Sequence, residues 1–302
     1  PRLSSAASDV YKRQALFGAN LIYGINYTVA KDVMPTYIEP LGFIFIRVSG
    51  AVLLFWLCYK FFFYEKVAKK DIPLLASCAL FGVAINQMLF FEGLNLTTPI
   101  NAAVIMVVNP ILVLIFAGLM STETLSKRKW LGIGVGAIGA LTLITNGGNI
   151  NLSQEHFYGN TLVFINATSY AIYLVLVKSL MKKYKPITVI SWVFLFGLLF
   201  VSPFGWSEFQ SIEWSTMPTI IVWEVGFVVI CTTFLAYLFN IYGLKTLNPS
   251  TVSTYIYLQP VLASIVAIIA SSDDLDFIKI LSAVLICIGV YLVSHKPKLI
   301  QE

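Results

Sequence analysis

Three charged residues stand inside long apolar runs and are the side chains best placed for chemistry: Arg47, Glu92 and Glu224. If these runs cross a membrane, an isolated charge costs at least about 2.5–3.5 kcal/mol, so each predicts a partner or a functional role. Arg47 and Glu92 are predicted to pair as a clamp or outer gate. Glu224 has no basic partner nearby in the sequence. It is either a proton-coupling carboxylate, since a buried carboxyl can have its pKa raised toward neutrality, or it reaches the outer headgroup layer.

A second set of side chains has the composition of a small-molecule site. Amides, tyrosines and hydroxyls recur three or four residues apart within the apolar runs, as on one face of a helix. Each alone is explained by an interhelical hydrogen bond worth about 0.6 kcal/mol, but together they predict a polar and aromatic cavity. The predicted lining residues are Asn20, Tyr23, Tyr27, Asn86, Gln87, Asn109, Tyr170, Tyr173, Thr233, Tyr237, Tyr257 and Gln259.

Two prolines are expected in the middle of membrane helices, Pro110 and Pro260. Proline removes a backbone hydrogen bond there and frees a carbonyl group. Each is either a tolerated kink or an unwound point beside the cavity. Asn109 and Gln259 directly precede them and are expected either to bind the freed backbone groups or to face the solute.

The sequence contains no set of residues for enzymatic, metal or nucleotide chemistry. Its two histidines, His156 and His295, are far apart in the expected topology, and there is no HExxH or P-loop pattern. The stretch Gly134–Gly139 matches GxGxxG but lies inside an apolar run, so it is interpreted as close helix packing. We therefore predict no catalytic residue, no metal and no cofactor.

The composition indicates where these residues sit. The 302 residues are 58% hydrophobic and 12% charged, with a mean hydropathy of +0.83, whereas soluble domains carry about 25% charged residues. We predict an all-α integral membrane protein, since only helices and closed barrels satisfy the backbone in lipid. Ten apolar runs predict ten transmembrane helices: 15–34, 40–60, 73–94, 99–120, 129–146, 158–180, 187–206, 219–243, 249–270 and 277–295.

The basic residues predict the orientation. Most of the 20 Lys and Arg fall in alternate loops and at the termini, so both termini are expected to be cytoplasmic. The net charge of +5 has this origin, and no nucleic-acid partner is expected. The expected location is the inner or plasma membrane of a cell. The expected partners are the lipid bilayer and a small-molecule substrate, and a homodimer is left open.

A repeat divides the chain. Asn109-Pro110 recurs as Gln259-Pro260 at an offset of 150, and Tyr23–Lys31 recurs as Tyr170–Lys178 at an offset of 147. Five helices per unit is an odd number, so the second unit is predicted to be inverted, as in secondary transporters. The predicted segments are two repeats at 15–146 and 157–296, a cytoplasmic tail at 297–302, and a polar stretch at 1–14. That stretch lacks helical periodicity and is interpreted as non-native residues before a truncated first helix.

With these features the sequence resembles the EamA-type ten-helix permeases of the drug/metabolite transporter superfamily. The similarity rests on Tyr23-Gly24 to Lys31, on Pro40 with Arg47, on the stretches 90–115 and 242–265, and on the Glu123–Ser126 element before a Gly-rich helix. It implies secondary transport of small metabolites by alternating access, with export of amino acids or related compounds expected. The alternatives are a facilitative or proton-coupled importer and, less favoured, a membrane-embedded sensor or enzyme.

Overall fold

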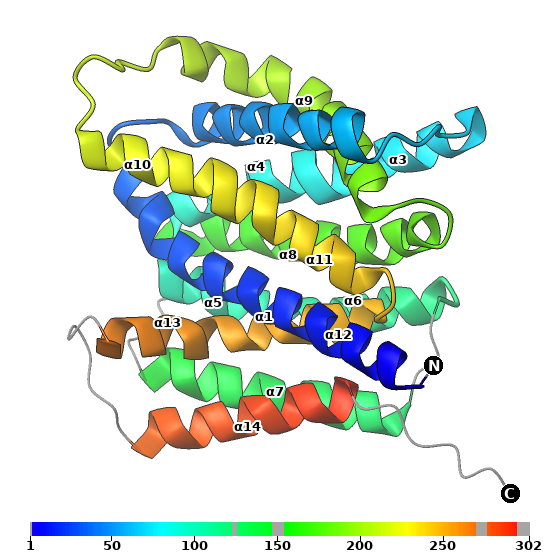
Figure 1. Cartoon of the computed structure of the whole chain (residues 1–302). Coiled ribbons are helices and arrows are strands. Elements are labelled where there is room, and N and C mark those ends of the chain that lie inside the picture. Colours follow the sequence, from blue (N-terminus) through cyan, green and yellow to red (C-terminus); the bar gives the residue numbers. More distant parts are fainter. Residues whose placement is uncertain (1, 123–125, 147–153, 270–276, 295–302) are drawn as a thin grey trace, which may run out of the picture.

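A computed structural model describes residues 2–122, 126–146, 154–269 and 277–294, and within these ranges every regular element is helical (Figure 1). The expected Glu123–Ser126 element and the tail at 297–302 therefore lie wholly or largely outside the described residues. Proline opens several helices at the first turn, where its missing N–H costs nothing. The α-helices are α1 (Arg2–Val33), α2 (Pro40–Phe62), α3 (Ile72–Ala79), α4 (Ile85–Leu96), α5 (Pro99–Met106), α6 (Asn109–Leu119), α7 (Lys127–Asn146), α8 (Gln154–Met181), α9 (Pro186–Gln210), α10 (Thr219–Phe227), α11 (Ala236–Leu244), α12 (Pro249–Thr254), α13 (Leu258–Ile269) and α14 (Phe277–Ser294).

The outer surface of the bundle is apolar. Large aliphatic side chains point away from the core, such as Leu53 at 62% exposure and Leu199 at 61%. Surfaces of this kind suit lipid rather than water. Among the described residues, six helical stretches are long and apolar enough to cross a membrane: Pro40–Phe62, Lys69–Leu96, Asn101–Leu119, Phe157–Met181, Pro186–Gln210 and Thr219–Leu244.

Two of these stretches contain a π-helical turn in their middle. The wide turn Leu80–Ala84 joins α3 to α4, and Val228–Leu235 joins α10 to α11. Such turns push backbone and side chains out of regular register and often mark functional sites. In the first, Gly82 lets the Tyr173 ring approach closely, since a Cβ there would lie 2.4 Å from the ring.

The two prolines expected at mid-helix lie just after short interruptions of their helical stretches. The chain breaks between α5 and α6, and between α12 and α13 it passes through a 3₁₀ turn at Tyr255–Tyr257. Pro110 and Pro260 consequently lie in the first turns of α6 and α13. Of the two alternatives, a bend in an unbroken helix and an unwound point, the structure has a short interruption just before each proline. Proline is tolerated there because it is at a helix start, whereas it is costly in a helix interior.

The first helix extends further towards the N-terminus than the apolar run at 15–34 predicts, because α1 begins at Arg2 and continues without interruption to Val33. Arg13 donates from Nη2 to the carbonyl oxygen of Ser294 at 2.8 Å, so the start of α1 lies against the end of α14. A cation at the C-terminus of a helix pairs with carbonyl groups that have no partner in the helix. A helix can form without an apolar periodic pattern, so the lack of helical periodicity in 1–14 did not predict where α1 begins.

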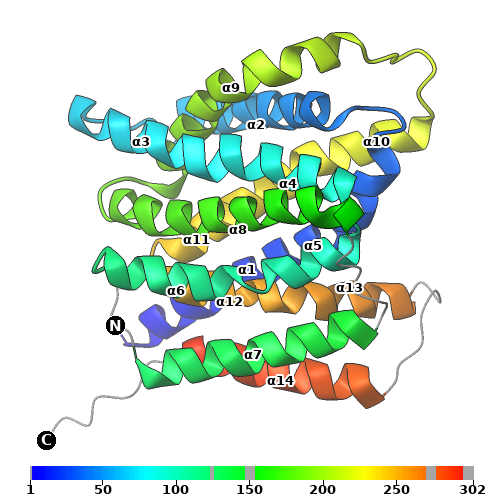
Figure 2. The same cartoon turned by 180° about the vertical axis from the view of Figure 1, so that it is seen from behind.

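The helices pack in antiparallel neighbours (Figures 1 and 2). Helix α2 lies beside α9, α4 beside α8, α1 beside α11, and α7 beside α14. The last pair is held together by small residues. An added Cβ on Gly289 would lie 2.6 Å from the Gly136 backbone, and one on Gly132 would lie 2.9 Å from the carbonyl of Gly289. The GxGxxG stretch is thus part of helix α7 and of a close helix crossing.

This crossing predicts the outcome of a matched pair of substitutions. Gly289→Ala should lower the stability of the purified protein by about 1–3 kcal/mol, because backbone atoms of α7 cannot move aside for the new methyl group. Gly134→Ala is the control, since nothing lies within 4 Å of a Cβ there. Thermal unfolding in detergent measures both. Equal melting temperatures for the two variants would contradict the packing described here.

Candidate functional site

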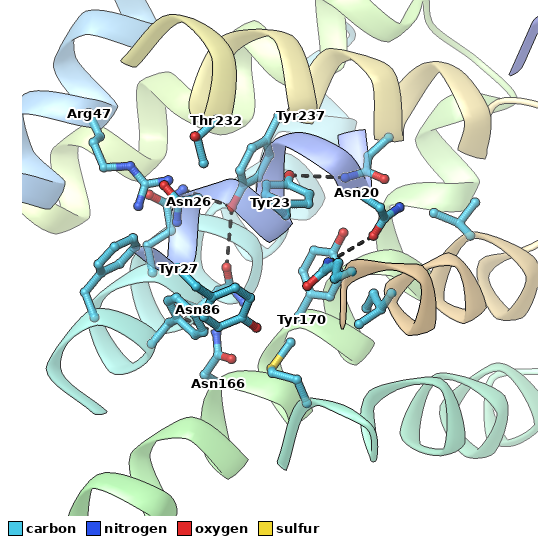
Figure 3. Close-up of a pocket in the computed structure, with 18 residues that line it drawn as sticks. Asn20, Tyr23, Asn26, Tyr27, Arg47, Asn86, Asn166, Tyr170, Thr232 and Tyr237 are labelled. Atoms are coloured by element: carbon cyan, nitrogen blue, oxygen red, sulfur yellow. Dashed lines mark hydrogen bonds between the residues drawn. The ribbon is translucent and has the colours of Figure 1, made fainter. Parts of the chain in front are cut away.

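A cavity of about 100 Å³ lies in the middle of the bundle (Figure 3). Its wall comes from α1, α2, α4 and α5 and from α8, the π-helical turn before α11, α11, α12, the 3₁₀ turn and α13. The volume holds several water molecules and is below the 300–1,000 Å³ typical of small-molecule sites. Nine residues singled out from the sequence border it: Asn20, Tyr23, Tyr27, Arg47, Asn86, Gln87, Tyr170, Tyr237 and Gln259.

Four residues of the predicted lining lie behind the cavity wall. Asn109 donates from Nδ2 to the carbonyl of Ala167 at 2.8 Å, and Tyr257 donates to the carbonyl of Val107 at 3.1 Å. Thr233 donates to the carbonyl of Val228 at 2.7 Å, and Tyr173 packs against the π-helical turn at Gly82. Tyr257 and Thr233 thus bond to irregular backbone, whereas Asn109 bonds to the regular helix α8. The wall of the cavity includes none of the four residues.

Nine further residues border the cavity and were not predicted to line it. Asn26 and Asn166 continue the helical spacing of Tyr23 and Tyr170, so the period used for the others was sufficient to find them. The apolar members carry no signal that separates them from ordinary core residues. The nine are Asn26, Phe90, Phe91, Met106, Asn166, Thr232, Asn240, Val252 and Ile256.

Hydrogen bonds hold the tyrosines of the cavity in place (Figure 3). Gln87 donates from Nε2 to the hydroxyl of Tyr237 at 3.0 Å, and that hydroxyl donates to Oδ1 of Asn86 at 3.4 Å. Asn240 donates from Nδ2 to the hydroxyl of Tyr23 at 3.1 Å. The rings of Tyr23 and Tyr237 meet edge to face at 6.4 Å. The wall therefore presents fixed hydroxyl groups and aromatic faces.

Two hydrogen bonds from side-chain amides connect the helices that begin after the breaks, α6 and α13, to other helices. Asn109 in α6 bonds to Ala167 of α8, and Gln259 in α13 donates from Nε2 to Oδ1 of Asn20 in α1 at 2.9 Å. Each bond thus ties the residue before a proline to a helix of the opposite half of the chain. Asn109 binds a carbonyl of α8 and not the backbone freed by the proline, whereas Gln259 borders the cavity.

Arg47 makes different contacts from those expected. Its side chain is 2% exposed, Nε donates to Oγ1 of Thr233 at 3.1 Å, and its guanidinium carbon lies 4.4 Å from the centre of the Phe91 ring. No ion pair between Arg47 and Glu92 forms within the described part of the chain. One residue along a helix turns the side chain by about 100°. Because Phe91 faces Arg47, Glu92 points elsewhere and is half-buried.

Glu92 and Glu224 both lie outside the cavity wall. Glu224 stands in α10, is half-buried, and has a carboxylate oxygen, Oε2, without a hydrogen-bond partner. The residues that line the cavity include one formally charged side chain, Arg47, and no acidic one.

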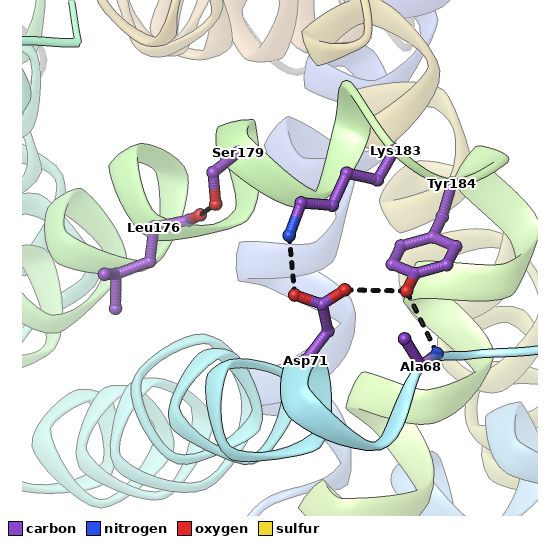
Figure 4. Close-up of polar contacts among 6 residues, drawn as sticks. All are labelled: Ala68, Asp71, Leu176, Ser179, Lys183 and Tyr184. Carbon is purple, nitrogen blue, oxygen red and sulfur yellow. Dashed lines mark hydrogen bonds and ion pairs between the residues drawn. The ribbon is translucent and has the colours of Figure 1, made fainter.

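Contacts between the two halves of the chain lie at both ends of the bundle. At one end, Asp71 accepts hydrogen bonds from Nζ of Lys183 at 2.6 Å and from the hydroxyl of Tyr184 at 2.7 Å (Figure 4). The Asp71 carboxylate raises the pKa of the Lys183 ammonium, which therefore stays charged. At the other end, Oε2 of Glu208 accepts from the backbone N–H of Gly42 at 2.8 Å, in the first turn of α2.

Comparison with known proteins finds matches that are described as transporters. The description "EamA-like transporter family" matches residues 14–145 and again 157–295. "Uncharacterized transporter YyaM" of Bacillus subtilis (strain 168) is 26% identical over 92% of each chain. An "Uncharacterized transporter" of Archaeoglobus fulgidus is 24% identical, over 86% of this chain and 89% of that protein. A solved structure titled "Crystal structure of protein" has the same fold, with a TM-score of 0.74 and 17% identity over 94% of this chain and 96% of that one.

The contacts of Asp71 predict a stability difference. Asp71→Ala should lower the melting temperature more than Lys183→Ala, because Asp71 accepts hydrogen bonds from two side chains, whereas Lys183 donates a hydrogen bond to one, Asp71. The double variant should be no less stable than Asp71→Ala alone, since both changes break the same contact. Lys182→Ala, an exposed neighbour, is the control. Additive losses in the double variant would show that the two side chains are not coupled.

Proposed function

The chain belongs to the EamA-like transporter family, and from this membership we propose that it is a secondary transporter that exports small polar metabolites, amino acids or related compounds, by alternating access. The observation that carries the proposal is the central cavity. It is polar and aromatic, it lies within a bundle with an apolar outer surface, and both halves of the chain form its wall. This is the place and composition of a solute site in transporters built from repeats.

We propose further that the ten expected spans form two inverted five-helix repeats. The irregular elements support this, because each half has a π-helical turn in its third span and a break in its fourth. The helix neighbours also support it. With α1 equivalent to α8 and α4 to α11, the pair α1 and α11 corresponds to α8 and α4, and both pairs pack together. Likewise, α1 beside α13 corresponds to α8 beside α6.

Two hydrogen bonds support a two-fold axis through the cavity. Gln87 bonds to Tyr237, and Tyr257 bonds to Val107, and in each bond the partners are 150 residues apart, the offset of the repeat. Equivalent residues of two copies touch each other only at the axis that relates the copies. With an odd number of spans in each repeat, that axis lies in the membrane plane. A solute there is equidistant from both surfaces, as alternating access requires.

The proposed orientation places both termini in the cytoplasm of a cell membrane. The end of the bundle that carries Lys182, Lys183 and the start of α1 is rich in basic residues, and the opposite end carries Glu39 and Glu213. Lys and Arg are retained on the cytoplasmic side. The lipid bilayer and a small solute remain the proposed partners. No contact in the structure bears on a homodimer.

The mechanism follows from where the two halves touch. The Asp71 contact joins the first half to the second at the cytoplasmic end, and the Glu208 contact joins them at the outer end. The Asp71 contact includes an ion pair in which the Lys183 side chain is half exposed, and such pairs are typically worth below about 1 kcal/mol. The Glu208 contact is a single hydrogen bond to backbone. We propose that rocking of the halves breaks one contact while the other stays closed. The solute site then opens to one side at a time without covalent chemistry.

Proton coupling through Glu224 is less well supported than facilitative transport, because this carboxylate does not border the cavity. A facilitative carrier, in which the solute gradient drives flux, needs no such group. Import remains the alternative direction, and no contact in the structure favours it.

Counterflow in liposomes tests the proposal. Protein reconstituted with a loaded mixture of unlabelled amino acids and organic acids should take up labelled members of that mixture. Tyr237→Ala and Gln259→Ala should reduce the rate at least tenfold, because both side chains border the cavity. Tyr242→Ala, an exposed position in the same helix as Tyr237, should not. Glu224→Gln should leave flux and its response to a pH gradient unchanged. Flux that survives both cavity variants would contradict the proposed site.

A further inference from the structure

We propose that the transported solute is a small hydroxylated organic acid, a monoanion whose carboxylate is bound by Arg47. This inference rests on the proposed transport function and narrows its substrate class. Its basis is the charge of the cavity wall and the set of hydrogen-bonding atoms that the wall leaves unused.

Arg47 is a buried cation without an anionic partner. It is 2% exposed and borders the cavity, and no carboxylate of the described residues forms an ion pair with it. Its contacts are neutral: the hydroxyl of Thr233 and the face of Phe91. Its terminal nitrogen Nη1 has no hydrogen-bond partner. A buried donor without a partner is destabilising, so a solute group that accepts a hydrogen bond from this nitrogen would be stabilised in the cavity.

A carboxylate supplies what this side chain lacks. The guanidinium is a planar fork of N–H donors that matches the two oxygens of a carboxylate. A solute anion would also neutralise the buried charge, since burying a charge is tolerated best when the charge is paired. The anion that compensates Arg47 in the loaded carrier is therefore the solute itself.

The rest of the wall distinguishes an acid from an amino acid. The lining contains no acidic side chain, so a bound ammonium group would have Arg47 as its only charged neighbour. Like charges repel strongly away from water. A monoanion brings the site to zero net charge, whereas a zwitterion leaves it at one positive charge.

The unused acceptors indicate what else the solute carries. Gln87 Oε1, Asn26 Oδ1 and Asn166 Oδ1 are buried side-chain oxygens without partners, and all three residues border the cavity. Gln87 and Asn166 already donate their N–H groups to Tyr237 and to the backbone of Asn86, so their oxygens remain to accept. Neutral hydroxyl groups on the solute are donors that fit these oxygens without adding charge.

Matched ligands test the inference on the purified full chain. Two series share a carbon skeleton: lactate, alanine and lactamide, and 2-hydroxy-4-methylpentanoate, leucine and 2-hydroxy-4-methylpentanamide. Each is added at constant ionic strength and pH, and the melting temperature is recorded, because a ligand that binds the folded state raises it. We expect the hydroxy acid of at least one series to raise the melting temperature. The amino acid should need at least tenfold more, and the amide should have no effect.

Variants at the cation extend the test. Arg47→Gln should abolish the shift by the hydroxy acid, and Arg47→Lys should restore part of it, since lysine keeps the charge and loses the fork. Tyr242→Phe, outside the cavity, is the control. The ligand comparison on the wild-type chain stands even if an Arg47 variant does not fold. An equal shift by amide and acid, a stronger shift by the amino acid, no shift by any ligand, or an unchanged shift in Arg47→Gln would each overturn the inference.

Flux separates this inference from the proposed function. Hydroxy-acid binding that depends on Arg47, without uptake into liposomes, would keep Arg47 as the binding residue for the carboxylate and would contradict transport of that acid. Uptake of amino acids that is unaffected by Arg47→Lys would support transport and overturn the inference.

Discussion

The requirement that every backbone polar group find a partner in lipid governs this structure. The chain interrupts its helices near the centre of the bundle, and each interruption exposes carbonyl groups that water cannot reach. The Tyr257 hydroxyl bonds to the carbonyl of Val107 in the break between α5 and α6. The Asn109 amide, just after the same break, bonds to the carbonyl of Ala167 in the uninterrupted helix α8. Both bonds reach from one half of the chain to the other. The irregular backbone that surrounds the cavity is therefore stable only when the two halves are packed together.

The need for backbone hydrogen-bond partners explains why the polar residues have different positions. Asn109 and Tyr257, which bond to backbone carbonyl groups, lie behind the wall, and those whose hydroxyl and amide groups bond to one another, such as Tyr237 and Gln87, border the cavity. Arg47 belongs to neither group, because its charge has no anionic partner among the described residues. The contacts of Asp71 and Glu208 lie at the ends of the bundle, where water competes and contacts can open and close.

Much of this could be predicted from the sequence, for identifiable reasons. Helices and family follow from apolar runs and repeated motifs, which are set by lipid and need no knowledge of packing. Polar side chains are rare in apolar runs, and this rarity singled out four residues that border the cavity: Asn20, Tyr23, Tyr27 and Tyr237. Asn109, Tyr173, Thr233 and Tyr257 were placed wrongly because breaks and π-helical turns change the direction in which a side chain points. The partner of Arg47 was missed because Phe91 and Glu92 are adjacent in sequence and face different neighbours.

The central claim is that the two halves rock about a solute site, with one end closed while the other opens. Distances between spin labels measure this directly, in a variant whose native cysteines are replaced. One pair of labels, at Lys66 and Lys182, spans the end that holds the Asp71 contact, and a second pair, at Thr36 and Glu213, spans the opposite end; all four positions are exposed. The account predicts two populations in which one distance lengthens while the other shortens, with a solute shifting the balance between them. Distances that stay constant at both ends, or that lengthen together, would contradict it.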